Sequence, residues 1–122
     1  AISLGKQAYG SQQRIHFDDL GLFRILMQCE DRDELSKVHD ETIGLLRRYD
    51  EQNNINLVGT LRVYFDQDCS LKETSQQLYI HVNTLKYRLQ KIYEVTGYNV
   101  NLAEDRLYLH VGLKLILILN KP

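Results

Sequence analysis

The stretch from Ser70 to Gly97 constrains the fold of this chain more than any other part of its sequence. Ser70 and Glu73 have the spacing of a capping box. In such a box the serine hydroxyl accepts a hydrogen bond from the glutamate amide, and the glutamate carboxylate accepts one from the serine amide. The box predicts a short helix that begins directly after Ser70. The expected apolar side of this helix is Leu71, Thr74, Ser75 and Leu78.

A tight connection and a longer helix follow in the sequence. Residues 79–81 form the connection, and a second helix is expected from about Val82 to Thr96, where Gly97 supplies a left-handed stop. Apolar residues recur in this second helix at spacings of four, three and four, which makes one buried stripe: Leu85, Leu89, Ile92 and Thr96. A short capped helix, a tight turn and a longer helix make a helix-turn-helix, here at about 70–97.

The side of the second helix opposite this stripe is polar. At 100° per residue it presents Asn83, Tyr87, Gln90, Lys91 and Glu94, with Thr84 and Lys86 on its edges. Such side chains can donate and accept hydrogen bonds at the edges of DNA bases, as a helix lying in the major groove must. The second helix is therefore a candidate recognition helix.

The rest of the chain is also helical in its patterning. Helices are expected at about 18–28, 31–39, 40–52, 56–65 and 103–119. The last of these is apolar on most sides, which predicts burial within its own fold or against a partner. The sequence thus predicts an all-α domain of six or seven helices over residues 18–122. Residues 1–17, with a short strand-like alternation at 14–17, are expected to be an extended tail or linker from a preceding domain.

Charge is balanced overall but uneven along the chain. The net charge is −1 and the isoelectric point about 6.5, so bulk charge points neither to nucleic acid nor to a membrane. Within 70–92, Glu73 stands alone against Lys72, Lys86, Arg88 and Lys91, a net of +3. Residues 30–51 hold eight acids and four bases, a net of −4. Such segregation is compatible with phosphate binding by the helix-turn-helix.

Catalytic and metal-binding patterns are absent from the sequence. It has no glycine-rich phosphate loop, no G-x-S-x-G and no H-E-x-x-H, and its cysteines and histidines never reach ligand spacing. We therefore expect neither an enzyme, nor a metal, nor a cofactor. Cys29 and Cys69 are too few for a disulfide framework and favour the cytoplasm. The apolar run 107–119 is too short to span a membrane.

Residues 78–89 resemble the helix-turn-helix of the PucR/CdaR family of bacterial transcription regulators. The family pattern is L-x-I-H-x-N-T-L-x-Y-R-L, and every specified position is matched by the run from Leu78 to Leu89. Further similarity lies in 19–23, 45–50, 60–64, 94–97 and 105–107, so the resemblance covers about 18–119. This chain departs from the family at Ser75, where an alanine is common, and at Val82, where many members carry a basic residue.

The resemblance implies properties of a larger protein. Members are usually longer, with a sensing region and a central domain before this C-terminal domain, and a start at Ala1 fits a piece of such a chain. They are similar in acting as dimeric regulators of catabolic genes that respond to a small metabolite sensed upstream. We therefore expect double-stranded DNA and a second copy of the chain as partners, and no membrane partner.

The expected DNA contacts come from both helices and their connection. They are Ser70, Lys72, His81, Val82, Asn83, Thr84, Lys86, Tyr87, Arg88 and Lys91. Several keep a structural alternative. Thr84 can act as a cap and Tyr87 can pack on a neighbouring helix, while Lys86 and Lys91 can bind phosphates or only solvate the surface.

Arg88 lies nearer the core and can instead form an internal salt bridge, to Glu73 or Asp105. His81 is interpreted as a hydrogen-bonding turn residue rather than a pH switch. For the domain as a whole, the rival hypothesis is a helical interaction or dimerisation module that keeps the shape of the motif without binding DNA.

Overall fold

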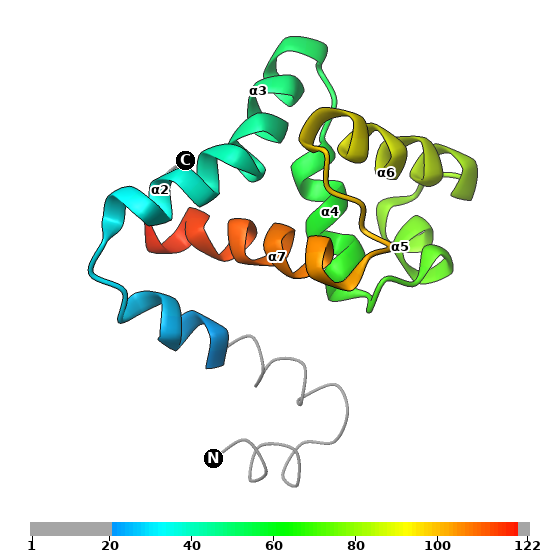
Figure 1. Ribbon diagram of the computed structural model, residues 1–122. Coiled ribbons are helices and arrows are strands. Elements are labelled where there is room, and N and C mark those ends of the chain that lie inside the picture. The colour runs from blue at the N-terminus through cyan, green and yellow to red at the C-terminus, as the bar shows by residue number, and fades with distance from the viewer. Residues whose placement is uncertain (1–20, 120–122) are drawn as a thin grey trace, which may run out of the picture.

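The computed structural model describes residues 21–119, and within that range the chain is α-helical with no strand (Figure 1). Residues 21–27 are helical, and six further helices follow. Their bounds are Arg32–Glu41 (α2), Ile43–Asn53 (α3), Leu57–Asp66 (α4), Leu71–Leu78 (α5), Val82–Thr96 (α6) and Ala103–Ile118 (α7). The expected all-α fold is confirmed. The extended segment expected at 1–17 lies outside the described residues.

Side-chain caps explain why several helices begin where they do. The side chains of Asp31, Asn56 and Ser70 accept hydrogen bonds from the backbone amides of Glu34, Gly59 and Glu73. Asn54 caps the end of α3 and Gly97 the end of α6, both with left-handed backbone.

One half of the expected capping box does not form. The Ser70 amide donates to the carbonyl of Gln67 at 3.0 Å instead of to the Glu73 carboxylate. The turn before α5 therefore already satisfies the amide that the glutamate would have capped.

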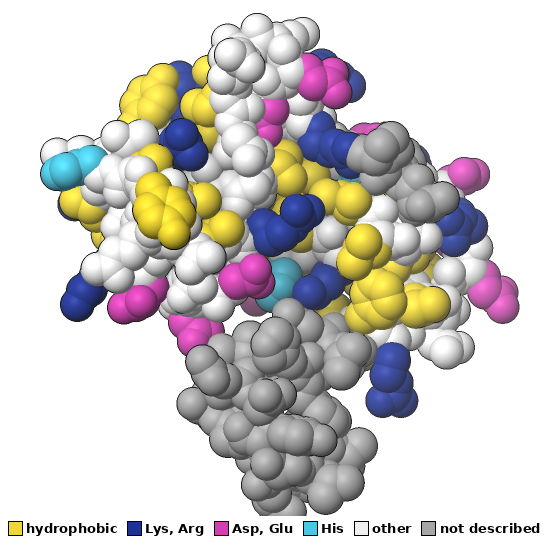
Figure 2. All heavy atoms as spheres, turned by 180° about the vertical axis from the view of Figure 1, so that it is seen from behind, with side chains coloured by type: hydrophobic (Ala, Val, Ile, Leu, Met, Phe, Trp, Pro, Cys, Tyr) yellow, Lys and Arg dark blue, Asp and Glu magenta, His cyan; other side chains and the backbone are white. Residues whose placement is uncertain are grey.

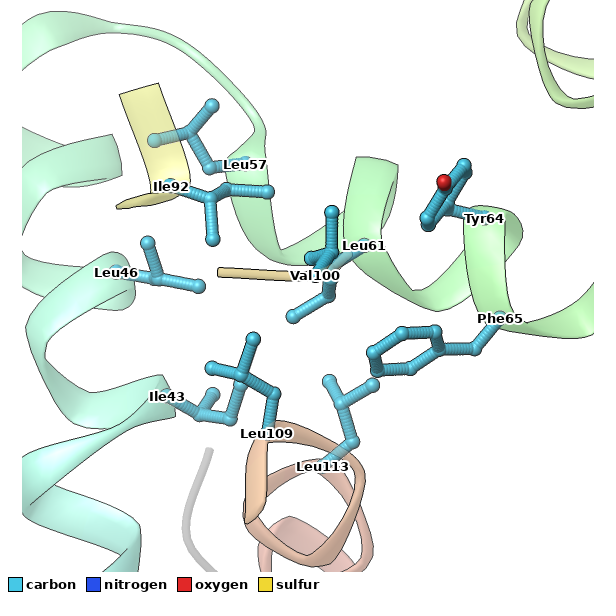
Figure 3. Packing of buried hydrophobic residues seen from close by; sticks show 10 residues of the cluster. All are labelled: Ile43, Leu46, Leu57, Leu61, Tyr64, Phe65, Ile92, Val100, Leu109 and Leu113. Carbon is cyan, nitrogen blue, oxygen red and sulfur yellow. The ribbon is translucent and has the colours of Figure 1, made fainter. Parts of the chain in front are cut away.

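Four helices and the connection between α6 and α7 build one hydrophobic core (Figure 3). Ile43 and Leu46 come from α3, Leu57 and Leu61 from α4, Ile92 from α6, and Leu109 from α7; all six are fully buried. Figure 3 shows these side chains pointing toward one another, with Val100 from the connection among them. Burial of about ten such side chains is the main favourable term for this fold.

Helix α7 passes very close to the corner between α2 and α3. A Cβ atom on Gly112 would collide with the Thr42 hydroxyl and press against Ile43. Glycine at this position lets α7 pack against both helices.

Helix α7 lies within the range expected for the last helix, and it begins after Leu102, which gives no side-chain cap. The fold itself does not bury it all round, because Leu107 and Leu117 are 52% and 71% exposed. Burial of this part of α7 against a partner stays a prediction. No helix in the described part of the chain is long and apolar enough to cross a membrane.

Candidate nucleic-acid interface

Helices α5 and α6 and their connection form the helix-turn-helix, which packs on α4. Tyr79 closes α5 with left-handed backbone, and the amide of Ile80 donates to the Ser75 carbonyl at 3.0 Å. His81 then caps α6, because its Nδ1 accepts a hydrogen bond of 3.0 Å from the amide of Asn83. His81 is thus a hydrogen-bonding turn residue, and its cap needs an imidazole with a free Nδ1 lone pair.

The buried and exposed sides of α6 follow the sequence pattern. Leu85 and Ile92 are fully buried, whereas Asn83, Thr84, Lys86 and Tyr87 are exposed. In Figure 2, the view from behind, hydrophobic side chains protrude among polar ones on the left, the side where the helix-turn-helix lies. Tyr87 keeps 57% of its surface exposed although it lies mid-helix. This side of α6 is open to a partner.

Lys91 is engaged by neighbours on its own helix. Its Nζ lies 3.0 Å from Glu94 Oε1 and 5.6 Å from the centre of the Tyr87 ring. The hydrogen bond and charge of Glu94 raise the pKa of Lys91, and Lys91 in turn lowers the pKa of Glu94. Lys91 therefore faces any ligand as half of an ion pair rather than as a separate positive charge.

Arg88 points into the domain. Its Nη1 donates to Thr60 Oγ1 on α4 at 3.1 Å, and the half-buried side chain forms no salt bridge with Glu73 or Asp105. Asp105 instead accepts a hydrogen bond from the amide of Asn99 at 2.9 Å. The internal salt bridge considered for Arg88 is therefore wrong, because the partner of the guanidinium group inside the domain is a hydroxyl group and not a carboxylate.

The remaining candidate residues lie around the start of each helix. The Ser70 hydroxyl caps α5, Lys72 is exposed on its first turn, and Val82 is half-buried at the start of α6. Ser75, a departure from the family pattern, is buried, and its hydroxyl donates to the Lys72 carbonyl at 2.9 Å. The serine is therefore accommodated without an unpaired polar group.

Sequence reasoning did not identify two residues that hold this unit together, Thr60 and Asp50. Thr60 accepts from Arg88 and donates to the Asn56 carbonyl at 2.7 Å. The Asp50 carboxylate, at the end of α3, accepts hydrogen bonds from the amides of Leu57 and Val58, at 2.8 and 3.1 Å. No local pattern indicates this second cap, because the acid lies seven residues before the start of α4 and the preference of a helix start for acids is confined to its first turn.

Within the range that the structure describes, no group of three or more histidine, cysteine or acidic side chains could hold a metal ion. Cys29 is exposed and Cys69 half-buried, and both are free thiols. The arrangement presents a polar helix face and no catalytic constellation in this part of the chain.

Residues 57–115 match the family described as the PucR C-terminal helix-turn-helix domain. This range begins at α4 and reaches into the last turns of α7, so it includes the whole helix-turn-helix.

Three curated relatives are similar over most of this chain. The proline-responsive transcriptional activator PutR of Bacillus subtilis is 32% identical over 88% of this chain and 26% of its own length. The carbohydrate diacid regulator of Escherichia coli is 33% identical over 92% of the chain and 28% of its own length. The purine catabolism regulatory protein of B. subtilis is 32% identical over 84% of this chain and 19% of its own length. The chain therefore spans about a quarter of the length of such relatives. No solved structure matches it.

Proposed function

The chain belongs to the PucR family and carries the helix-turn-helix domain of its transcription regulators, and on that premise we propose that α6 is the recognition helix. Its N-terminal half enters the major groove of double-stranded DNA and binds base edges. The proposed contacts from α6 and the turn before it are His81, Val82, Asn83, Thr84, Lys86, Tyr87 and Lys91. Ser70 and Lys72, at the start of α5, contact the flanking phosphate backbone.

One observation carries this proposal: the polar side of α6 is exposed over its N-terminal half, where most of its side chains make no hydrogen bond with the rest of the domain. The side chains of Asn83 and Thr84 make no hydrogen bond with the described part of the chain, and neither does Lys86. Leu85 and Ile92, on the opposite side, are locked in the core. A rigid helix with free donors and acceptors on its outer face suits binding to base edges.

We extend the proposal to the whole regulator. Residues 18–122 act as its DNA-binding domain in the cytoplasm, and a sensing region precedes them. The regulator binds as a dimer to an imperfect palindrome whose half-sites lie about 34 Å, or a multiple of that, apart. It controls catabolic genes in response to a small metabolite. The names of the relatives support this, since they refer to proline, purine catabolism and carbohydrate diacids.

The outer side of α7 is the proposed dimer contact. Leu107 and Leu117 expose more than half of their surface there. Because exposed leucines are costly in water, a second copy of the chain would gain by covering them. The substitution Leu117→Glu should shift the chain from dimer to monomer in sedimentation velocity, while Met27→Glu, at an exposed position outside α7, should not.

DNA binding is tested by fluorescence anisotropy of a labelled fragment from upstream of the gene. The titration compares this fragment with scrambled DNA at two salt concentrations. It includes the double variant Thr84→Ala/Tyr87→Ala and the control Met27→Ala/Gln28→Ala, which truncates exposed side chains far from α6 (Figure 1). Circular dichroism establishes that both variants are folded.

The proposal expects binding that prefers the native fragment, weakens steeply with salt and is lost only in the Thr84/Tyr87 variant. If the chain binds neither DNA at low salt, the titration is repeated with a dimerising fusion. A second failure would overturn the proposal in favour of an interaction module.

A further inference from the structure

A hollow of about 310 Å³ lies beside the proposed recognition helix. It is bordered by the first residue of α5, the middle of α6 and the connection between α6 and α7. Figure 1 shows this connection running from the end of α6 back across α4 toward α5 before it enters α7. The hollow therefore opens next to the helix face that we assign to DNA.

The polar lining of the hollow carries hydrogen-bond donors and no carboxylate. Its polar side chains include Lys86 and Gln90 from α6 and Asn99 and Asn101 from the connection. Lys86 has no ion-pair partner among the described residues, and the Asn101 side chain is exposed. One free cation beside several amides is a lining that attracts an anion.

The floor of the hollow is apolar. Leu71, Leu89 and Val100 contribute to it. A deoxyribose ring is flanked by phosphates in the DNA backbone, so a site that combines an apolar floor with donors at its rim matches one backbone unit.

The connection is held in place by its own hydrogen bonds. The amide of Asn99 donates to Asp105 Oδ2 at 2.9 Å, and the amide of Asn101 donates to Asn99 Oδ1 at 2.8 Å. Arg106 Nη1 donates to the carbonyl of Val100 at 2.9 Å. These bonds fix the backbone that carries the Asn101 side chain, so little ordering entropy is lost when a ligand arrives.

The geometry points to a second DNA contact: the hollow binds the sugar-phosphate backbone that flanks the bases bound by α6. Lys86 and the Asn101 amide lie at its rim, where they would bind a phosphate. Charge and continuity favour this occupant, because Lys86 and Gln90 belong both to the hollow and to the exposed part of α6. This inference rests on the proposed function.

The test places charges at the rim of the hollow in the full chain. Asn101→Asp and Asn101→Lys change one exposed side chain that makes no hydrogen bond within the described part of the chain. The matched control pair is Gln28→Asp and Gln28→Lys, which change net charge equally at an exposed position far from α6. Each variant is titrated against a duplex of random sequence and against the fragment from upstream of the gene, at several salt concentrations.

Asn101→Lys should tighten binding to both DNAs and increase the salt slope by about one, because one more phosphate is neutralised. Asn101→Asp should weaken binding to both by about three- to tenfold, with the same preference for the native fragment. The two Gln28 variants should change neither the affinity for DNA nor the salt slope. If the Asn101 pair behaves like the Gln28 pair while the unmodified chain binds DNA, the inference is wrong and the proposed function stands. If the unmodified chain binds no DNA, even as the dimerising fusion, both are overturned.

Discussion

The guanidinium group of Arg88 on α6 donates a hydrogen bond of 3.1 Å to the hydroxyl of Thr60 on α4. Thr60 is 1% exposed and passes the interaction on, since its own proton goes to the carbonyl of Asn56. These two hydrogen bonds thus join the middle of α6 to the first turn of α4. The most basic side chain of α6 therefore holds α6 against α4.

Arg88→Gln should therefore affect stability rather than phosphate binding. We expect the free energy of unfolding to fall by about 1–2 kcal/mol, because the Thr60 hydroxyl loses its charged donor. The salt slope of DNA binding should not change. Lys86→Gln is the matched variant, and it should lower the slope by about one while leaving unfolding unaltered. Urea unfolding and anisotropy at several salt concentrations measure both. If both variants lower the salt slope of DNA binding equally, Arg88 contacts a DNA phosphate and this prediction is wrong.

Two buried threonines should respond in opposite ways to replacement by valine. The hydroxyl of Thr74 on α5 is fully buried and has no hydrogen-bond partner in the described part of the chain. Thr74→Val removes that desolvated group and should raise the free energy of unfolding by about 1 kcal/mol. Thr60→Val should lower it by about 1–3 kcal/mol, because Arg88 and the Asn56 carbonyl both lose a partner. Urea midpoints at one pH decide the signs, and a loss in both variants contradicts the Thr74 prediction.

Glu94→Gln should strengthen DNA binding. The change releases Lys91 from its 3.0 Å ion pair and removes a negative charge from the exposed side of α6. We expect tighter binding to every duplex and a steeper salt dependence. Glu30→Gln, which makes the same charge change at an exposed position before α2, is the control. Anisotropy titrations should separate the two variants. Equal shifts would mean that only net charge matters.

Alkaline pH should destabilise the fold. Burial raises the pKa of the Cys69 thiol above its ordinary 9.0, with Arg106 opposing and Asp68 adding to the shift. An acid whose pKa is higher in the folded state keeps its proton longer there, so the unfolded chain ionises first as pH rises. The free energy of unfolding should therefore fall above about pH 9. Burial raises the pKa of Tyr64 in the same sense.

Urea midpoints from neutral pH to about pH 10 measure this effect. Cys69→Ala should flatten the alkaline decline, whereas Cys29→Ala should not, because Cys29 is exposed. Identical pH profiles for the two variants would show that the Cys69 thiol does not contribute.

Local signals in the sequence were enough to predict the helix-turn-helix. Ser70 and Gly97 act on backbone groups within a few residues, so the start of α5 and the end of α6 followed from capping alone. The exposure of Asn83 and Tyr87 followed from helical periodicity. The DNA contacts themselves stay a prediction.

Interactions between distant residues could not be predicted in the same way. Arg88 was matched with acids because charge is visible in a sequence, but packing of α6 on α4 placed it beside a hydroxyl 28 residues away. The Ser70 amide donates to the Gln67 carbonyl in the preceding turn, so it does not bind the Glu73 carboxylate. The exposure of Leu107 and Leu117 on α7 could not be predicted either, because hydrophobicity alone does not say which side of a helix the rest of the fold covers.

The carboxylate of Asp50 joins the end of α3 to the first two amides of α4. Helix α3 also packs against α2 and α7 on one side and against α6 on the other. Helix α3, about 16 Å long, therefore connects α7, which carries the exposed leucines, with α6. If α3 moves as a rigid unit, a displacement of α2 or α7 would change the angle at which α6 meets a partner. In the proposed regulator, a sensing region would then need to move only the end of α3 nearest α2 to change the direction in which α6 points.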